Sequence, residues 1–426
     1  MHPEDLDHAS KAPNPMQNIA VLRNVIQEYA WGSKSALAEL LSQPFPTDNP
    51  QAEMWMGAHP KAPSQVFWDG RWRSLLELIR AHPVEILGEA VAATHSGCLP
   101  FLFKVLAAEK PLSIQVHPNA AQARSGFRRE NQRGIPLDAP HRNYKDDNHK
   151  PEIICALTSF WALNGFRPVG AMLSLLNTIQ IPTLAGEVAD LQKQPNRTGL
   201  RNFFRHLVSK GEDLRRRAVR EAVAFAQTRS EEAPLWRWMI TLNQEYPEDI
   251  GVLAPLLLNL VELQPGEAMY LPAGELHAYL HGVGIELMAN SDNVLRGGLT
   301  PKHIAIDELL DILNFSEREV TILQPIPRVP AEAEFCTPND EFRLSVLDVQ
   351  TGTSYRSGDV RSAEIMICTQ GQADIRELPQ GAVTCIAQGV SVLVPAAVPQ
   401  YLIQGNARIY KASVPRIQPP AGNMEK

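Results

Sequence analysis

A hairpin pattern occurs twice in this chain, and it constrains the fold more than any other feature of the sequence. The first copy reads LQPGEAMYLPAGELHAYL (263–280) and the second reads IAQGVSVLVPAAVPQYLI (386–403). Aligned without gaps, the copies share a glycine and a proline, Gly266 with Gly389 and Pro272 with Pro395. A glycine turn, an alternating strand, a Pro-Ala turn and a second strand form the repeating unit of a small antiparallel barrel. The sequence therefore predicts two such barrels, with chance similarity between two hairpins as the alternative.

The two copies differ at one informative position. His277 in the first copy aligns with Gln400 in the second. If the histidine holds a ligand, the second copy has lost that function. We therefore predict a mixed, mainly β fold with two cupin-like jelly-roll domains, of which the first works and the second is structural.

A helical segment interrupts the strand pattern. Between about Val169 and Tyr246, apolar residues recur at spacings of three and four, which is typical of amphipathic helices. We expect an all-α domain inserted into the first barrel, and a Pro-rich segment, PIPRVPAEAEFCTPNDEF, marks the boundary with the second. The predicted parts are a disordered leader (1–15), a catalytic β domain (16–167 together with 247–325), the helical insert (168–246), a second, metal-free cupin-like domain (326–415) and a tail (416–426).

The composition bears on the partners and the compartment. The 426 residues carry a formal net charge of −7, which disfavours nucleic acid or an anionic membrane as the main partner. The five cysteines form no CxxC pair and are odd in number, as in chains kept reduced. The N-terminus lacks an apolar signal core, and the longest apolar run is interrupted by Pro255 and Asn259. We therefore expect a cytoplasmic protein without a membrane segment.

The stretch PLSIQVHPN carries two polar side chains on one face of a strand that otherwise reads as buried. Gln115 and His117 project together because alternate residues of a strand point to the same side. Glu152 lies in an extended segment after Pro151, and His277 begins a strand of the first repeat copy. Two imidazoles and two oxygens would suit a divalent ion, above all zinc. By spacing alone, Gln115 and His117 could equally be two satisfied polar residues of a core.

A second cluster is cationic. Five basic residues lie in segments that flank the metal candidates, namely Lys104, His149, Lys150, Arg296 and Lys302. Arginine and lysine suit a phosphate group, and the two glycines after Arg296 allow a ligand to approach the backbone closely. The alternative for this segment is a solvated charged loop.

Longer stretches carry a resemblance to a known family. The chain resembles the type I phosphomannose isomerases in IQEYAWGSKSAL, AEMWMGAHP and LPFLFKVLAAEKPLSIQVHPN. The similarity continues in GIPLDAPHRNYKDDNHKPEI, in YPEDIGVLAPLLLNLVELQPGEAMYLPAGELHAYL and in ELMANSDNVLRGGLTPKH. These long motifs extend the resemblance over residues 16–410.

The resemblance implies an enzyme. It would be a zinc-dependent aldose–ketose isomerase that interconverts mannose 6-phosphate and fructose 6-phosphate by proton transfer through a cis-enediol. It implies the same two cupin-like domains and helical insert, with a single zinc ion per chain held by Gln115, His117, Glu152 and His277. In carbohydrate metabolism the reaction would serve either GDP-mannose biosynthesis or the breakdown of mannose.

The resemblance also implies roles for the polar residues around the metal. The family's catalytic arginine falls on Arg296, and ring opening would use Asp292 and His149 as an acid–base pair. Lys150 and Glu286 are both candidates for the base that removes the proton from C2. The implied substrate contacts are Lys104, Glu286, Lys302 and Trp31, and Glu53 lies in a motif that borders the same pocket.

Two other functions fit the same residues. A non-catalytic cupin could bind a metal and a phosphosugar as a sensor, although the complete set of zinc and cationic candidates disfavours this. An isomerase for a different 6-phospho-aldose would use the same kind of site. In either case the partner is a small sugar phosphate, and we expect a monomer because the sequence shows neither heptads nor an apolar interface stripe.

Overall fold

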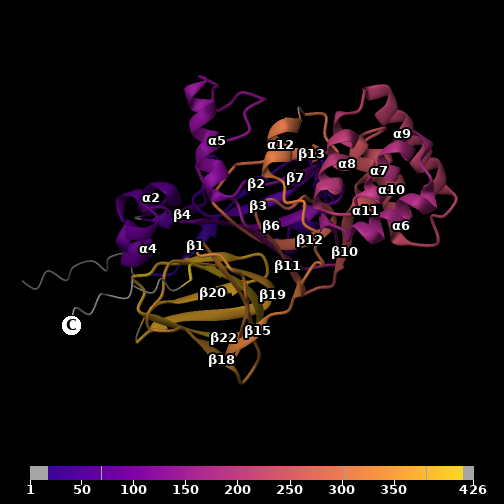
Figure 1. Cartoon of the computed structure of the whole chain (residues 1–426). Helices are drawn as coiled ribbons and strands as arrows, with labels where there is room; N and C mark the ends of the chain where they lie inside the picture. Colours follow the sequence, from indigo (N-terminus) through magenta and orange to yellow (C-terminus); the bar gives the residue numbers. More distant parts are fainter. Residues whose placement is uncertain (1–17, 69, 303, 380, 416–426) are drawn as a thin grey trace, which may run out of the picture.

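The computed structural model describes residues 18–415 except positions 69, 303 and 380. The predicted leader and tail therefore lie outside the described residues. Two antiparallel sheets and a group of helices make up the described part (Figure 1). The mainly β class is confirmed, whereas the jelly-roll form and the domain bounds stay predictions. Within the described ranges, no helix is long and apolar enough to cross a bilayer.

The first sheet holds eleven strands, with the order β14-β11-β8-β12-β6-β3-β2 and β7, β9, β10 and β13 paired beside this path. Strand β12 is central, because its first half pairs with β7 and β9 and its second half with β6 and β8. The bounds are β2 (Val25–Gln27), β3 (Glu53–Met56), β6 (Phe101–Ala108), β7 (Ile114–Val116), β8 (Glu152–Ala156), β9 (Phe160–Phe166), β10 (Leu258–Leu263), β11 (Ala268–Leu271), β12 (His277–Ala289), β13 (Leu295–Gly298) and β14 (Ile322–Leu323).

The second sheet also holds eleven strands, with the order β15-β16-β17-β22-β19-β21-β1-β4-β5 and with β18 and β20 beside this path. Strands β1, β4 and β5 come from the N-terminal part of the chain, and β1 pairs with β21 through Ala20 and Leu393. The bounds are β1 (Ala20–Arg23), β4 (Gln65–Trp68), β5 (Arg71–Ser74), β15 (Ile326–Val329), β16 (Glu332–Phe335), β17 (Arg343–Val349), β18 (Ser354–Arg356), β19 (Glu364–Leu378), β20 (Val383–Ala387), β21 (Ser391–Val394) and β22 (Gln400–Ser413).

The sequence repeat corresponds to a repeat in structure. Strands β11 and β21 begin at aligned positions, Ala268 and Ser391, and β12 and β22 begin at His277 and Gln400. One strand lies between the two hairpin strands in each copy. It is β8 in the first sheet and β19 in the second. Because chance similarity would not reproduce this pairing order, the repeat is structural.

Helices occur where the apolar periodicity predicted them, between about Val169 and Tyr246, and also at positions that were not predicted, such as α5. Helices α6 to α10 come between β9 and β10 in the chain and lie together at one end of the molecule (Figure 1). Near the N-terminus, Pro83 separates α2 from α3 because proline cannot continue a helix. The bounds are α1 (Ala36–Leu40), α2 (Leu75–Ala81), α3 (Pro83–Leu87), α4 (Glu89–Thr94), α5 (Ala120–Gln132), α6 (Val169–Ile179), α7 (Ala185–Lys193), α8 (Arg197–Ser209), α9 (Glu212–Gln227), α10 (Pro234–Glu245), α11 (Ala254–Leu257) and α12 (Ile306–Ile312), with short 3-10 turns at Pro182–Leu184 and Ile250–Leu253.

Two apolar clusters divide the faces of the second sheet between them. Ile365 packs in a cluster with Phe103 and Ile285 of the first sheet. Its neighbour Met366 points the other way and packs with Ile409 and with side chains from every strand between β17 and β22. Because one cluster gathers side chains from all of these strands, the second sheet curls around it.

Candidate metal centre

Three buried side chains, carried at the ends of β7, β8 and β12, converge at one point. His117 directly follows β7, Glu152 begins β8 and His277 begins β12. The ligand atoms of the three residues lie within 4.8 Å of one another. Nε2 of His117 lies 3.4 Å and Nε2 of His277 lies 3.5 Å from the carboxylate oxygens of Glu152. Sequence analysis had placed all three in one site, and the structure brings them together.

Backbone carbonyls orient both imidazole rings. Nδ1 of His117 lies 2.7 Å from the carbonyl oxygen of Asn293, and Nδ1 of His277 lies 3.0 Å from that of Glu275. A carbonyl oxygen can only accept, so each Nδ1 carries the proton and each Nε2 presents a lone pair. This arrangement is typical of metal-ligating histidines.

The protonation states also fit a metal ion. Burial lowers the pKa of His117 to about 4, so its imidazole is neutral at pH 7. Burial by itself would raise the pKa of Glu152, but the charge of Lys150 is the main effect that outweighs it and lowers the pKa, so the carboxyl is ionised. Nε2 of His117 is buried and has no hydrogen-bond partner among the described residues. Neutral imidazole, carboxylate and an unpartnered nitrogen are what a zinc ion requires.

Gln115 lies beside the three ligands. Its backbone pairs with His277 on one side and with Arg296 on the other. Together with Glu152 and His277 it lines a small cavity of about 50 Å³. Its side chain could therefore supply a fourth, neutral oxygen donor to the same ion.

Charged side chains also line this cavity. Nζ of Lys104 lies 2.8 Å from Glu286 and 3.4 Å from Glu53. Burial by itself would lower the pKa of Lys104, but the two carboxylates outweigh it and raise the pKa. Nζ of Lys150 lies 3.1 Å from Oε1 of Glu152. The predicted residues Lys104, Lys150 and Glu286 thus line the cavity at the metal ligands.

Sequence reasoning missed Tyr279 and gave Glu53 no role of its own, yet both line the cavity. Tyr279 lies two positions after His277 on the same strand, so the strand period could have identified it. Its hydroxyl is buried and has no hydrogen-bond partner within the described part of the chain.

Two cations, Arg296 and Lys302, lie on and just after β13. Arg296 pairs through its backbone with Gln115, and its charge, followed by burial, lowers the pKa of Lys302. Burial also lowers the pKa of Arg296. The backbone between them is held by Asp249, which accepts from the N–H groups of Leu299 (2.8 Å) and Thr300 (3.3 Å). No carboxylate among the described residues forms an ion pair with either cation, so both can bind an anion.

Three predicted site residues do not line the cavity at the metal ligands, namely Asp292, His149 and Trp31. Asp292 forms an ion pair with Lys61 at 2.8 Å and lies 3.5 Å from Nε2 of the buried His59. His149 contacts Glu341, from the second sheet's β16–β17 connection, through its Nε2. The structure records no contact between Asp292 and His149 among the described residues. Trp31 lies outside the described cavity lining and packs beside Tyr29, with the ring centroids 5.7 Å apart.

Comparison with known sequences points to one family. The family model for phosphomannose isomerase type I, catalytic domain, matches residues 19–169. Mannose-6-phosphate isomerase of Salmonella typhimurium is 45% identical over 358 residues, which cover 84% of this chain and 90% of the relative. The Escherichia coli K12 enzyme of the same name is 42% identical over 391 residues, covering 91% and 97% of the two chains. The Rattus norvegicus enzyme is 35% identical, covering 89% and 96%.

Solved structures give the same result. A mutant of phosphomannose isomerase from Salmonella typhimurium is 41% identical and superposes with a TM-score of 0.87, covering 93% of this chain and all of that one. A zinc-bound crystal structure of mannose 6-phosphate isomerase is 41% identical with a TM-score of 0.84 and the same coverage.

Proposed function

This chain belongs to the type I phosphomannose isomerase family, and we propose that it interconverts mannose 6-phosphate and fructose 6-phosphate through a cis-enediol intermediate. The observation that supports this best is the buried cluster of His117, Glu152 and His277, which opens onto a cavity walled by lysines and carboxylates. A cytoplasmic location and a role in GDP-mannose supply belong to the same proposal and rest on the family resemblance alone.

The metal in this proposal is zinc, as in the zinc-bound relative. His117, Glu152 and His277 would hold it, with Gln115 as the fourth ligand. When bound, zinc supplies a Lewis acid that polarises oxygen atoms of the sugar. The neutral amide of Gln115 would leave more positive charge at the site than a second carboxylate would.

The resemblance implies a catalytic role for Arg296; in addition to that role, we assign the phosphate group to Arg296 and Lys302. Both are cations without a carboxylate partner among the described residues, and Arg296 lies on β13 next to Gln115. The guanidinium of Arg296 and the ammonium of Lys302 suit the phosphate dianion. They would hold the phosphate end of the sugar while its other end enters the cavity at the metal ligands. The hydrogen bonds to Asp249 keep the connecting backbone in place.

Ring opening and the proton transfer between C2 and C1 fall to different residues. For the ring-opening step we keep Asp292 and add His59, its neighbour at 3.5 Å, as a partner beside His149. A base then removes the proton from C2 to give the cis-enediol and returns it to C1. Lys150 and Glu286 both line the cavity and are the two candidates for this base.

The experiment that tests the function is a product assay on the purified, zinc-loaded chain. Mannose 6-phosphate, glucose 6-phosphate and ribose 5-phosphate are supplied separately, and the ketose products are identified by NMR. We expect rapid conversion of mannose 6-phosphate and at most slow conversion of the others. Preference for another aldose phosphate would change the assigned substrate, and binding without turnover of any of them would indicate a sensor.

The phosphate assignment is tested with Arg296→Ala in the same assay. We expect kcat/KM to fall by at least about a hundredfold, because one strong charged contact is lost. Arg318→Ala is a control for removing a half-buried arginine elsewhere. If Arg296→Ala kept kcat/KM within about tenfold of the wild type, the assignment would be wrong.

A further inference from the structure

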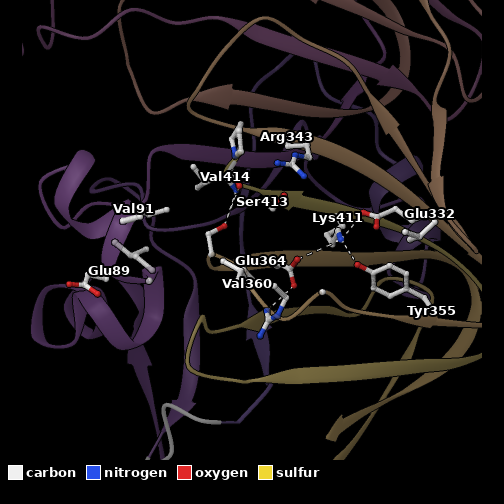
Figure 2. A pocket seen from close by; sticks show the side chains of 18 of the residues that line it. Glu89, Val91, Glu332, Arg343, Tyr355, Val360, Glu364, Lys411, Ser413 and Val414 are labelled. Carbon is white, nitrogen blue, oxygen red and sulfur yellow. Dashed lines mark hydrogen bonds and ion pairs between the residues drawn. The ribbon is translucent and has the colours of Figure 1, made fainter. Parts of the chain in front are cut away.

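A second, larger cavity lies between helices α3 and α4 and the second sheet, and its lining shares no residue with the cavity at the metal ligands (Figure 2). Its volume is about 750 Å³. Sites for small molecules typically measure about 300–1,000 Å³, so the cavity is large enough for a sugar-sized ligand.

Strand alternation places charged side chains inside the curled second sheet. On β19, Glu364 points to the same side as Met366, which belongs to the interior cluster. On β22, Lys411 in the same way follows Ile409. The face that is apolar deeper inside the sheet is therefore polar where it meets the cavity.

The most buried of these charges is already neutralised. Nζ of Lys411 lies 2.7 Å from Oε1 of Glu332, 2.7 Å from the hydroxyl of Tyr355 and 3.6 Å from Glu364 (Figure 2). Burial by itself would lower the pKa of Lys411, but Glu364 and its other neighbours outweigh it and raise the pKa. Lys411 thus stays charged and organises its partners rather than binding an external anion.

Other groups around the cavity keep hydrogen-bonding capacity. Arg343 has only a long contact to a carboxylate, 3.7 Å to Glu334, and its side chain is 30% exposed. Tyr355 accepts from Lys411, and its own hydroxyl hydrogen has no acceptor within the described residues. One oxygen of Glu332 binds Lys411, which leaves the second oxygen.

Aliphatic side chains complete the cavity. Val91 of α4 and the strongly exposed Val360 belong to its lining, together with Leu87. A cavity with an aliphatic wall, a carboxylate, a hydroxyl and an arginine matches a sugar ring, which has C–H surfaces as well as hydroxyl groups.

We propose that this cavity is a second binding site for a phosphorylated hexose. Sugar hydroxyls donate to Glu332 and accept from Tyr355, and the C–H surface of the ring packs on the aliphatic wall. The phosphate binds Arg343, whose only carboxylate contact among the described residues is the 3.7 Å one to Glu334. Of the other two guanidinium groups in the lining, Arg361 pairs with Glu364 at 3.0 Å and Arg356 already donates to the amide oxygen of Gln400.

Hydrogen exchange of the full chain, followed by mass spectrometry, tests the site with mannose 1-phosphate as the probe. A phosphate on O1 prevents ring opening, so the probe cannot be turned over at the metal centre. We expect slower exchange in segments 354–364 and 411–415 at millimolar probe, in addition to any change around the metal ligands. Mannose and inorganic phosphate, tested separately, should each give weaker protection of both segments.

Three variants sharpen the test. In Arg343→Ala, the half-saturating concentration should rise by about tenfold, as for one charged contact. Arg328→Ala is the matched control, because Arg328 pairs with the same Glu334 at 3.3 Å but does not line the cavity. This variant should bind mannose 1-phosphate as the wild type does. Val360→Glu places a negative charge at an exposed position of the lining. It should weaken the binding of mannose 1-phosphate more than the binding of mannose.

Unchanged exchange in both segments would overturn the proposal. Equal binding of mannose and mannose 1-phosphate would overturn the contact between the phosphate and Arg343. Equal protection by inorganic phosphate alone would overturn the hexose assignment.

Discussion

Lys150 and Glu286 line the same small cavity, yet a single base is enough to move a proton from C2 to C1. Replacement of Lys150 by Met removes the amine but keeps most of the side-chain volume. If Lys150 is the base, kcat should fall by at least about a hundredfold while KM stays within about threefold. Glu286→Gln, assayed in parallel, should then be the milder variant.

Steady-state measurement of kcat and KM at saturating zinc tests this prediction. Lys110→Met is the control, since Lys110 makes a surface pair with Glu245. A normal kcat with a raised KM in Lys150→Met would leave Lys150 with a binding role and move the proton transfer to Glu286.

The lowered pKa of Asp292 should make the stability of the fold depend on pH. Burial raises its pKa, but hydrogen bonds from His59 and Lys61 outweigh burial and hold the pKa below its ordinary value of 3.8. A carboxyl with a lowered pKa in the folded state stabilises the fold above its unfolded pKa, and this contribution is lost as the pH falls below that value.

We therefore expect Asp292→Asn to be less stable than the wild type near pH 6, with the difference in unfolding free energy shrinking below about pH 4. Urea denaturation at several pH values measures it, with the exposed Asp213→Asn as the control. A difference that stays constant down to about pH 2.5 would contradict the pairing of Asp292 with His59 and Lys61.

At the scale of elements, the site depends on how the two halves of β12 are joined. Its first half carries His277 and pairs with β7 and β9, while its second half carries Glu286 and pairs with β6 and β8. Gly282 lies between the halves with φ +122°, and a Cβ there would lie 2.6 Å from the carbonyl oxygen of Ser159.

Gly282→Ala should therefore lower the free energy of unfolding by about 1–3 kcal/mol, because it combines backbone strain with a backbone clash. Gly170→Ala in α6 is the matched control. A Cβ at Gly170 meets nothing within 4 Å, and alanine favours the helix, so this variant should be neutral or slightly stabilising. Equal unfolding midpoints for the two variants would show that β12 does not depend on the glycine.

At the scale of the whole molecule, the second sheet reaches the segment that carries the metal ligand Glu152. Glu341 lies between β16 and β17 and contacts Nε2 of His149, 192 residues away in the chain. Glu341→Gln should lower kcat/KM by about tenfold without changing the zinc content, if this contact positions His149. Asp340→Asn, at the neighbouring position, is the control. Activity within about twofold of the wild type would limit the contact to a structural role.

Local patterns explain what could be predicted from the sequence. The alternation in IQVH placed Gln115 and His117 on one face, and the hairpin repeat predicted matching strands in both sheets. The helical periodicity predicted α6 to α10 because each of those helices buries one face.

Contacts between distant segments could not be predicted in this way. The pairing of β1 with β21, the contact of His149 with Glu341 and the pair of Asp292 with Lys61 depend on how finished elements dock. The spacing of residues within one segment does not indicate which distant segment it will contact. We expected Asp292 and His149 to act as an acid–base pair without knowing these contacts. In the structure Asp292 pairs with Lys61 and His149 contacts Glu341.

The measurement that tests the central proposal most directly follows zinc content and isomerase rate in one sample. The rate of conversion of mannose 6-phosphate to fructose 6-phosphate is measured before chelation, after chelation and during stepwise return of zinc. We expect the rate to fall as zinc is removed and to return in proportion to bound zinc, with a plateau at one ion per chain. A zinc-free sample that keeps its full rate would contradict the proposal that His117, Glu152 and His277 hold a catalytic metal.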